Sequence, residues 1–215
     1  MRLPNNSQRL VIVGRTGSGK TRAGMWHLSK RNFNTPWIML DYKRDELIAQ
    51  SPAIEIRAQD KLPKCGGLYV VRPNPTDEDE IVVEDMMLRM WKRGDIGLYC
   101  DEGFMVPNIK ALNMILTQGR SLRVPCITLS QRPVWLSRFV FSEADFFQLF
   151  DLNDIRDRKA VGSFMPQDAQ QRLPEFHSWY YDVGKGDIAP WSPVPSDDEI
   201  LSGFKIPRKH KLSFA

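Results

Sequence analysis

The chain contains, close to its amino end, the stretch Leu10-Val11-Ile12-Val13-Gly14-Arg15-Thr16-Gly17-Ser18-Gly19-Lys20-Thr21. Four apolar residues suited to a buried strand lead into a segment that matches the pattern G-x-x-x-x-G-K-[ST]. In this pattern the glycines let successive backbone N–H groups surround a phosphate, the lysine reaches the β- and γ-phosphate oxygens, and the final hydroxyl completes a Mg²⁺ shell. We therefore expect a phosphate-binding loop between a strand and a helix, formed by Gly14, Arg15, Thr16, Gly17, Ser18, Gly19, Lys20 and Thr21.

Strand-like and helix-like segments alternate beyond this loop. The expected strands and extended pieces cover residues 9–13, 36–40, 54–57, 68–72, 96–100, 126–130, 146–150 and 177–183. The expected helices cover residues 20–31, 44–50, 76–93, 108–119, 134–141 and 154–162, before a proline-rich exit through Pro190, Pro193 and Pro195. Such alternation predicts an α/β fold with a mostly parallel central sheet flanked by helices.

Length and charge set broad limits. With 215 residues, the chain has room for one compact ATPase domain, expected over residues 1–195, followed by a basic tail over 196–215. The net charge is only +4, and the basic residues that gather late in the chain are Lys205, Arg208, Lys209, His210 and Lys211. Nucleic-acid binding is compatible with this balance, but charge alone does not establish it.

The cysteines favour a reducing compartment. Cys65, Cys100 and Cys126 are odd in number and include no C-x-x-C pair, so neither a disulfide framework nor a zinc site is expected. Cys100 and Cys126 fit buried strand positions. The longest apolar stretches are strand-sized, well below the ~20 residues that cross a bilayer, so we expect no membrane span.

A second motif follows the strand expected at 96–100. This apolar run ends in Asp101 and Glu102, the Walker B pattern. Adjacent side chains at a strand end point to different sides, so Asp101 can hold Mg²⁺ while Glu102 orients and activates a water molecule. An acidic turn at a strand end is the plain structural alternative.

Two further features narrow the chemistry to ATP hydrolysis, with ATP and Mg²⁺ as the expected cofactors. Small-molecule kinases need no base beside the metal-binding acid, and the chain has no N-K-x-D guanine signature. Gln131 follows the strand expected at 126–130, where it can touch the γ-phosphate or its water, although a loop contact would look the same.

The acidic first turn Asp77–Glu80 and the lone histidines His27 and His177 are expected to be structural.

Three stretches carry a resemblance. Residues 119–133 contain Gly119-Arg120-Ser121-Leu122-Arg123-Val124-Pro125 and then Ile127-Thr128-Leu129-Ser130-Gln131-Arg132-Pro133. This block resembles the FtsK/HerA superfamily of DNA-pumping ATPases, in which an arginine-bearing helix end leads into a strand closing on T/S-Q-R-P. Asp41-Tyr42-Lys43-Arg44-Asp45-Glu46 is similar to that superfamily's D-P-K-G-E turn, with Tyr in place of Pro and Arg in place of Gly. The stretch 151–158 has a similar position, and the likeness spans about residues 9 to 165.

The short, single-domain members that this chain resembles are the genome-packaging ATPases of tailless double-stranded DNA viruses. The resemblance implies a P-loop NTPase fold of the RecA/ASCE type and a homo-oligomeric ring, expected to be a hexamer, around double-stranded DNA. It further implies a capsid vertex or portal protein as docking partner, and a location in the host cytoplasm or at the packaging vertex of the virion.

In such a ring one subunit supplies Lys20, Thr21, Asp101, Glu102 and Gln131, and a neighbour supplies an arginine that neutralises charge on the transferred phosphoryl group. The candidates, in order of preference, are Arg120, Arg123, and then Arg156 or Arg158. Arg132 is expected to shape its turn through internal ion pairs, whereas Lys92, Arg93, Arg138 and the basic tail are candidates for DNA contact.

Several other functions remain open at this point. A cellular or plasmid DNA-transfer ATPase would have the same site, and a filamentous-phage assembly ATPase would export single-stranded DNA. A nucleotide or nucleoside kinase is a different class, disfavoured by the pair Asp101-Glu102. A nucleotide-gated binding module without turnover is the last alternative, which replacing Glu102 with Gln would leave unaffected.

Overall fold

The computed structural model describes residues 1–74, 76–106 and 109–207. Within these residues the chain builds one sheet of nine strands. The strands are β1 (Leu10–Val13), β2 (Pro36–Asp41), β3 (Ile54–Glu55), β4 (Gly67–Val71), β5 (Gly97–Asp101), β6 (Cys126–Ser130), β7 (Phe146–Leu149), β8 (Ser178–Asp182) and β9 (Asp187–Trp191).

The strand order is β3-β4-β2-β5-β6-β1-β7-β8-β9. Strands β1 to β7 run parallel to one another, and the pairings of β7 with β8 and of β8 with β9 are antiparallel. Consequently β1 lies in the interior between β6 and β7, and the carboxyl ends of β1, β5, β6 and β2 meet at one edge of the sheet. Ligands of open parallel sheets bind at that edge.

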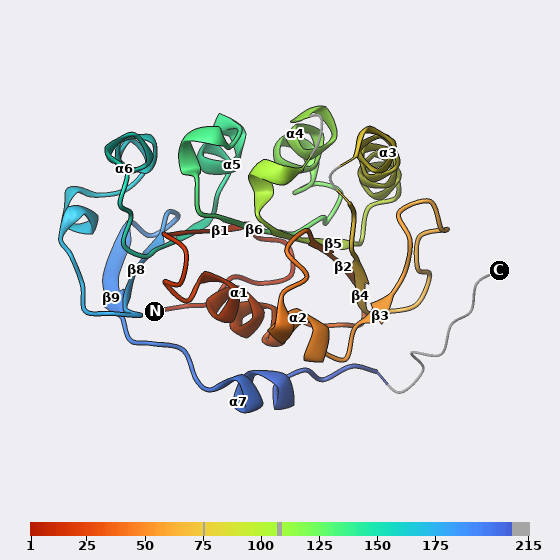
Figure 1. Ribbon diagram of the computed structural model, residues 1–215, viewed down its shortest axis with the longest axis horizontal. Coiled ribbons are helices and arrows are strands. Elements are labelled where there is room, and N and C mark those ends of the chain that lie inside the picture. The colour runs from red at the N-terminus through yellow and green to blue at the C-terminus, as the bar shows by residue number, and fades with distance from the viewer. Residues whose placement is uncertain (75, 107–108, 208–215) are drawn as a thin grey trace.

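Helices cover both faces of the sheet (Figure 1). One layer contains α3, α4, α5 and α6, and the other contains α1, α2 and α7. Their bounds are α1 (Lys20–Ser29), α2 (Glu46–Gln50), α3 (Asp77–Arg93), α4 (Ile109–Gln118), α5 (Arg138–Ser142), α6 (Ile155–Gly162) and α7 (Asp197–Ser202). The predicted α/β fold with a mostly parallel, helix-covered sheet is confirmed.

The two faces of β1 show how the strands build two cores. Leu10 and Ile12 belong to the apolar cluster under α1 and α2, while Val11 and Val13 belong to the cluster under α3 to α6. All four side chains are buried. Because successive strand residues point to opposite faces, a continuous apolar run is what a strand covered on both sides requires.

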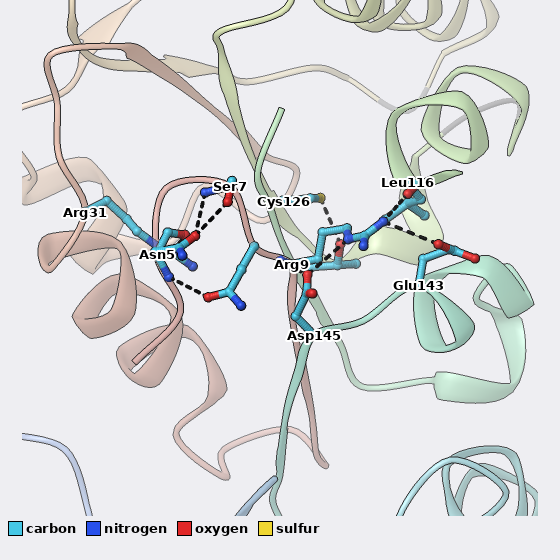
Figure 2. Close-up of polar contacts among 10 residues, drawn as sticks. Asn5, Ser7, Arg9, Arg31, Leu116, Cys126, Glu143 and Asp145 are labelled. Atoms are coloured by element: carbon cyan, nitrogen blue, oxygen red, sulfur yellow. Dashed lines mark hydrogen bonds and ion pairs between the residues drawn. The ribbon is translucent and has the colours of Figure 1, made fainter. Parts of the chain in front are cut away.

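At the edge of the sheet opposite the phosphate loop, Arg9 ties β1 to its neighbours (Figure 2). Its backbone N–H donates to Asp145 Oδ2 at 2.8 Å, and its buried guanidinium contacts the carboxylates of Asp145 and Glu143. The same guanidinium donates to the carbonyl of Leu116 near the end of α4. Arg9 thus links β1, α4 and the α5–β7 connection and fixes the start of the strand that leads into the loop.

Three elements differ from expectation. The proline-rich stretch after residue 183 contains a strand, β9, that was not expected. This strand includes Pro190, which is tolerated because β9 is at the edge of the sheet. Helix α7 lies in the segment predicted as a basic tail, and its Ile200 is fully buried. The expected helix 134–141 is divided into a 3-10 helix, Pro133–Trp135, and α5.

The remaining basic residues of the predicted tail, Arg208 to Lys211, lie outside the described residues. Cys100 and Cys126 are buried on β5 and β6, as predicted. Among the helices of the described residues, none combines the length and the hydropathy needed to cross a bilayer.

Candidate nucleotide-binding site

The loop between β1 and α1 has the backbone that its glycines allow. Gly17 and Gly19 have φ angles of +75° and +96°, in the left-handed region that glycine enters without steric cost. Gly19 is the N-cap of α1, so the free N–H groups of the helix start face the loop. This geometry turns several amide groups toward one point, as phosphate binding requires.

The loop is fastened to both strands that flank β1. The N–H of Gly14 donates to the carbonyl of Ser130 at the end of β6, at 3.3 Å, and the N–H of Arg15 donates to the carbonyl of Asp151 after β7, at 2.8 Å. A Cβ atom on Gly14 would come within 2.5 Å of the Phe150 Cβ. Position 14 therefore needs glycine for its packing against β7.

Lys20 lies buried at the start of α1, and its ammonium group donates to the carbonyl of Arg15 at 2.9 Å. Burial lowers the pKa of Lys20 to about 8, although the nearby Glu102 opposes this shift. A buried cation with a single carbonyl partner is poised to gain from a polyphosphate, whose oxygens accept charge-assisted hydrogen bonds.

Thr21 and Asp101 offer oxygen atoms suited to Mg²⁺. Thr21 Oγ1 donates to Asp101 Oδ1 at 3.3 Å, and the buried Asp101 Oδ2 has no hydrogen-bond partner among the described residues. Burial raises the pKa of Asp101 to about 7, an effect that Lys43 opposes and Glu102 reinforces. Because a hydroxyl and a carboxylate oxygen are the ligands that Mg²⁺ prefers, this pair fits the predicted metal position.

Glu102 leaves the strand direction and turns into the site. Its φ of +69° is unusual for a residue with a side chain, and it directs an almost fully buried carboxylate away from the line of β5. One carboxylate oxygen is ion-paired with Lys43, and the other accepts from the backbone N–H of Gln131 at 3.2 Å. The amide oxygen of Gln131 accepts in turn from the Thr16 hydroxyl. The loop, β5 and β6 are joined by these contacts.

Lys43 is a member of the site to which sequence analysis assigned no role. It follows β2, and strand pairing brings β2 beside β5, with Asp41 and Asp101 in register. Asp41 is fully buried and shapes the turn that carries Lys43, because it accepts from the N–H of Asp45 at 3.0 Å and from Arg72 at 3.2 Å. The Asp-x-Lys pattern of this turn is the sequence feature that could have identified Lys43 as a site residue.

The two preferred arginines do not enter the site of their own chain. Arg120 is exposed just beyond the end of α4, and no ion pair to it is found among the described residues. Arg123 is exposed and forms a two-pronged ion pair with Asp95. Arg156 is also exposed and pairs with Asp154, and Arg158 donates to the carbonyl of Leu152.

Arg132 and His27 have the internal contacts expected of them. Arg132 pairs with Asp154 at 3.3 Å and with Asp157 at 3.1 Å. The buried His27 Nε2 lies 2.9 Å from the amide oxygen of Gln148. Both residues therefore hold elements together rather than face the site.

A cavity of about 530 Å³ opens beside the loop and the start of α1. One group of lining residues comes from the loop and its surroundings and includes Lys20, Thr21 and Lys43. A second group, which we call the outer part, comes from the second half of the chain. The members of the outer part are Gln148, Phe150, Phe176, Ser192, Pro193 and Val194. None of these six was predicted as a site residue, because they are brought to the loop only by the pairing of β7, β8 and β9 and by the packing of α7.

Comparison with known proteins identifies a relative over almost the full length of the chain. The chain is 44% identical over 223 residues to the DNA packaging ATPase P9 of Enterobacteria phage PRD1, and the match covers 98% of each chain. No protein-family model matches the chain.

Solved structures support the fold. The genome packaging NTPase B204 of Sulfolobus turreted icosahedral virus 2, in complex with ATPγS, has a TM-score of 0.68 at 20% identity, with 89% of this chain and all of that chain covered. The pCW3 conjugation coupling protein TcpA has a TM-score of 0.56 at 13% identity, over 91% of this chain and 64% of that chain. A full-length relative at 44% identity decides the matter: the chain belongs to the family of viral DNA-packaging ATPases represented by P9.

Proposed function

We propose that this protein hydrolyses ATP to move double-stranded DNA into a preformed viral capsid. The observation that carries the proposal is the meeting of the phosphate loop with Asp101 and Glu102 at one sheet edge, in a chain that aligns over its full length with a DNA packaging ATPase. In a nucleoside kinase the acceptor hydroxyl takes the place of the attacking water and no base for hydrolysis is needed, whereas here Glu102 is held beside the loop by Lys43 and Gln131.

Different residues of the site bind different parts of Mg·ATP. The loop N–H groups and Lys20 bind the β- and γ-phosphates, while Thr21 and Asp101 hold the metal ion. When bound, Mg²⁺ neutralises charge on the phosphate oxygens and orients them. Lys43 adds a second cation to the lining of the cavity.

Hydrolysis then requires a positioned water. Glu102 accepts a proton from the water that attacks the γ-phosphorus, the bond to the bridging oxygen breaks, and ADP and inorganic phosphate result. The side chain of Gln131 orients this water or the γ-phosphate, since it lies beside Glu102 and is held by Thr16.

The arginine that completes the site comes from a neighbouring subunit of a ring, for which we propose six copies. Support comes from Arg120, which is exposed and does not line the cavity of its own chain. An arginine supplied by a neighbouring subunit couples hydrolysis to assembly. An isolated subunit lacks this positive charge, which typically raises the rate of hydrolysis by roughly 10³–10⁵-fold.

Exposed apolar side chains offer a surface for this assembly. Val134, Trp135 and Phe139 are 39%, 58% and 45% exposed and follow Gln131 closely in the chain. Ile155 of α6 is 65% exposed, and α6 packs on the 3-10 helix that carries Trp135. Clustered exposed apolar residues mark interaction surfaces, and we assign this one to a second copy of the chain.

The DNA contacts are proposed to be with phosphates rather than base edges, because a translocase has to pass any sequence. Of the predicted basic residues, Lys92, Arg93 and Arg138 are all exposed, but Arg93 donates to the carbonyl of Pro63 and Arg138 lies over the Phe164 ring. Lys92 is therefore the stronger candidate. The docking partner is a capsid vertex or portal protein, which places the motor in the host cytoplasm or at the packaging vertex.

The test is the steady-state ATPase rate with and without long duplex DNA. We expect duplex DNA to stimulate the wild-type rate and Glu102→Gln to abolish hydrolysis while ATP still binds. Glu78→Gln changes an exposed carboxylate of α3 in the same way and is expected to behave as wild type. Phosphate transfer to an added nucleoside, or equal rates for Glu102→Gln and wild type, would contradict the proposal.

A further inference from the structure

The cavity beside the phosphate loop continues into an outer part whose walls are largely apolar. A Cβ atom built on Gly19 would lie 3.6 Å from Phe176 Cδ1 and 3.8 Å from Phe150 Cε1, so both rings approach the start of α1. Pro193 and Val194 also line this part. Since the triphosphate end of a nucleotide lies on the loop, the outer part is where the nucleoside end would extend.

Phe176 is held in an unusual conformation. Its φ is +59°, a left-handed backbone that a bulky residue rarely adopts, yet its side chain is 47% exposed. Core packing therefore does not account for it. The turn is closed by the N–H of His177, which donates to the carbonyl of Pro174 at 3.1 Å, directly before β8. Strained residues of this kind gather at ligand clamps, and this one presents a ring to the cavity.

The apolar segment formed by Pro193 and Val194 is anchored at both of its ends. On one side β9 pairs with β8, and on the other α7 is held against α1, because Arg22 forms a two-pronged ion pair with Asp197 at 2.7 and 3.1 Å. Val194 packs against the apolar cluster under α1. The segment is thus a fixed part of the cavity.

The polar side chains around this outer part are already engaged. Gln148 bridges two buried partners, since its amide oxygen contacts His27 and its amide nitrogen donates to Ser178, each at 2.9 Å. Arg22 is paired with Asp197, and Asp45 caps α2 by accepting from backbone N–H groups. Among the described lining residues of the outer part, Ser192 is the remaining polar side chain.

We propose that Phe176 stacks on the nucleobase of the bound nucleotide and that Pro193 and Val194 contact it as further apolar wall, in a subsite that accepts adenine and guanine alike. The inference rests on the proposed function, because it assumes that the loop binds the triphosphate. Apolar side chains that contact only the face of a base discriminate weakly between adenine and guanine. Strong rejection of one base requires hydrogen bonds to the edge of its ring.

The test compares three Mg²⁺-bound probes by calorimetry: AMP-PNP, GMP-PNP and inorganic tripolyphosphate. On the wild type we expect dissociation constants for the two nucleotides that agree within about tenfold. Phe176→Ala is expected to weaken both nucleotides by about five- to 150-fold, the usual loss of one base–aromatic stack, and to leave tripolyphosphate unchanged. Ile81→Ala removes an exposed apolar side chain from α3, far along the sequence from the cavity lining, and should bind all three probes as wild type does.

A second variant separates stacking from folding. Phe176→Gly removes the ring and at the same time relieves the left-handed backbone, so the protein is expected to melt no lower than wild type but to lose the same nucleotide affinity. Phe176→Trp keeps a ring and should restore binding. Wild-type nucleotide affinity in Phe176→Gly, or an equal loss for tripolyphosphate, would overturn the subsite. If the wild type binds tripolyphosphate no better than Lys20→Ala does, the loop does not bind phosphates, and both the proposed function and the subsite are contradicted.

Discussion

The ammonium group of Lys43 is paired with the carboxylate of Glu102, across two neighbouring parallel strands. Glu102 is almost fully buried, whereas Lys43 is 38% exposed in its side chain and lines the nucleotide cavity. With Gln131 bound to the other oxygen, both oxygens of Glu102 have a partner. A partly exposed cation thus balances the charge of the buried carboxylate that we propose as the base in hydrolysis.

Replacing Lys43 with Met should lower the DNA-stimulated ATPase rate by roughly tenfold or more, because removing one partner of a buried ion pair leaves an uncompensated charge. Steady-state phosphate release measures the effect. Lys64→Met, which changes an exposed lysine between β3 and β4 in the same way, is the matched control and should retain the wild-type rate. A faster rate in Lys43→Met would instead mean that the pair restrains Glu102 before DNA arrives.

Asp101 leads to a prediction about Mg²⁺. Its unpartnered Oδ2 and the hydroxyl of Thr21 are the oxygen atoms at the proposed metal position. Asp101→Asn should raise the Mg²⁺ concentration that gives half-maximal ATPase activity by roughly tenfold or more, as loss of a metal-site group commonly does. Asp168→Asn alters an exposed carboxylate and should titrate as wild type. Identical Mg²⁺ curves for Asp101→Asn and wild type would remove Asp101 from the metal site.

The parts of the site that are contiguous in sequence could be predicted. The loop from Gly14 to Thr21 and the pair Asp101-Glu102 are short motifs at strand ends, so their meeting at one edge of the sheet follows from residue type and spacing. The Asp-x-Lys turn could have marked Lys43 as a candidate, but its contact with Glu102 depends on which strands become neighbours. The approach of Phe176 to Gly19 depends on strand pairing in the same way. Sequence separation hides such contacts from local patterns.

The missed elements at the end of the chain have local causes. Pro190 disfavours a strand in general, and only the edge position of β9 makes it acceptable. Helix α7 did carry a signal, because Ser196 and Glu199 match a capping box and the Ser196 hydroxyl accepts from the N–H of Glu199 at 3.4 Å. The segment was instead predicted to be a solvated tail because basic residues follow α7.

Arg120 can be tested as the arginine supplied by a neighbouring subunit. Arg120→Ala alone and Glu102→Gln alone should each lose at least roughly a hundredfold in ATPase rate. Mixing the two inactive proteins should restore part of the activity, because an Arg120→Ala subunit retains Glu102 and receives Arg120 from a Glu102→Gln neighbour. Arg123→Ala is the control, since Arg123 is already paired with Asp95. Full activity of Arg120→Ala, or no recovery on mixing, would exclude this role.

The last prediction concerns stability against pH and follows from His27. This side chain is fully buried beside Gln148, and burial lowers its pKa to about 3, whereas an unfolded histidine titrates near 6.5. Between these two values the unfolded chain binds the extra proton, so stability falls as the pH drops below about 6.5. From pH 7.5 to pH 5 this one group should reduce the free energy of unfolding by about 2 kcal/mol, measured by urea denaturation. His27→Gln keeps a donor for Gln148 without the titration, so it should start less stable but lose less between the two pH values. His177→Gln, which changes a histidine outside the core, should keep the wild-type difference, and an unchanged difference in His27→Gln would place the pH sensitivity in another group.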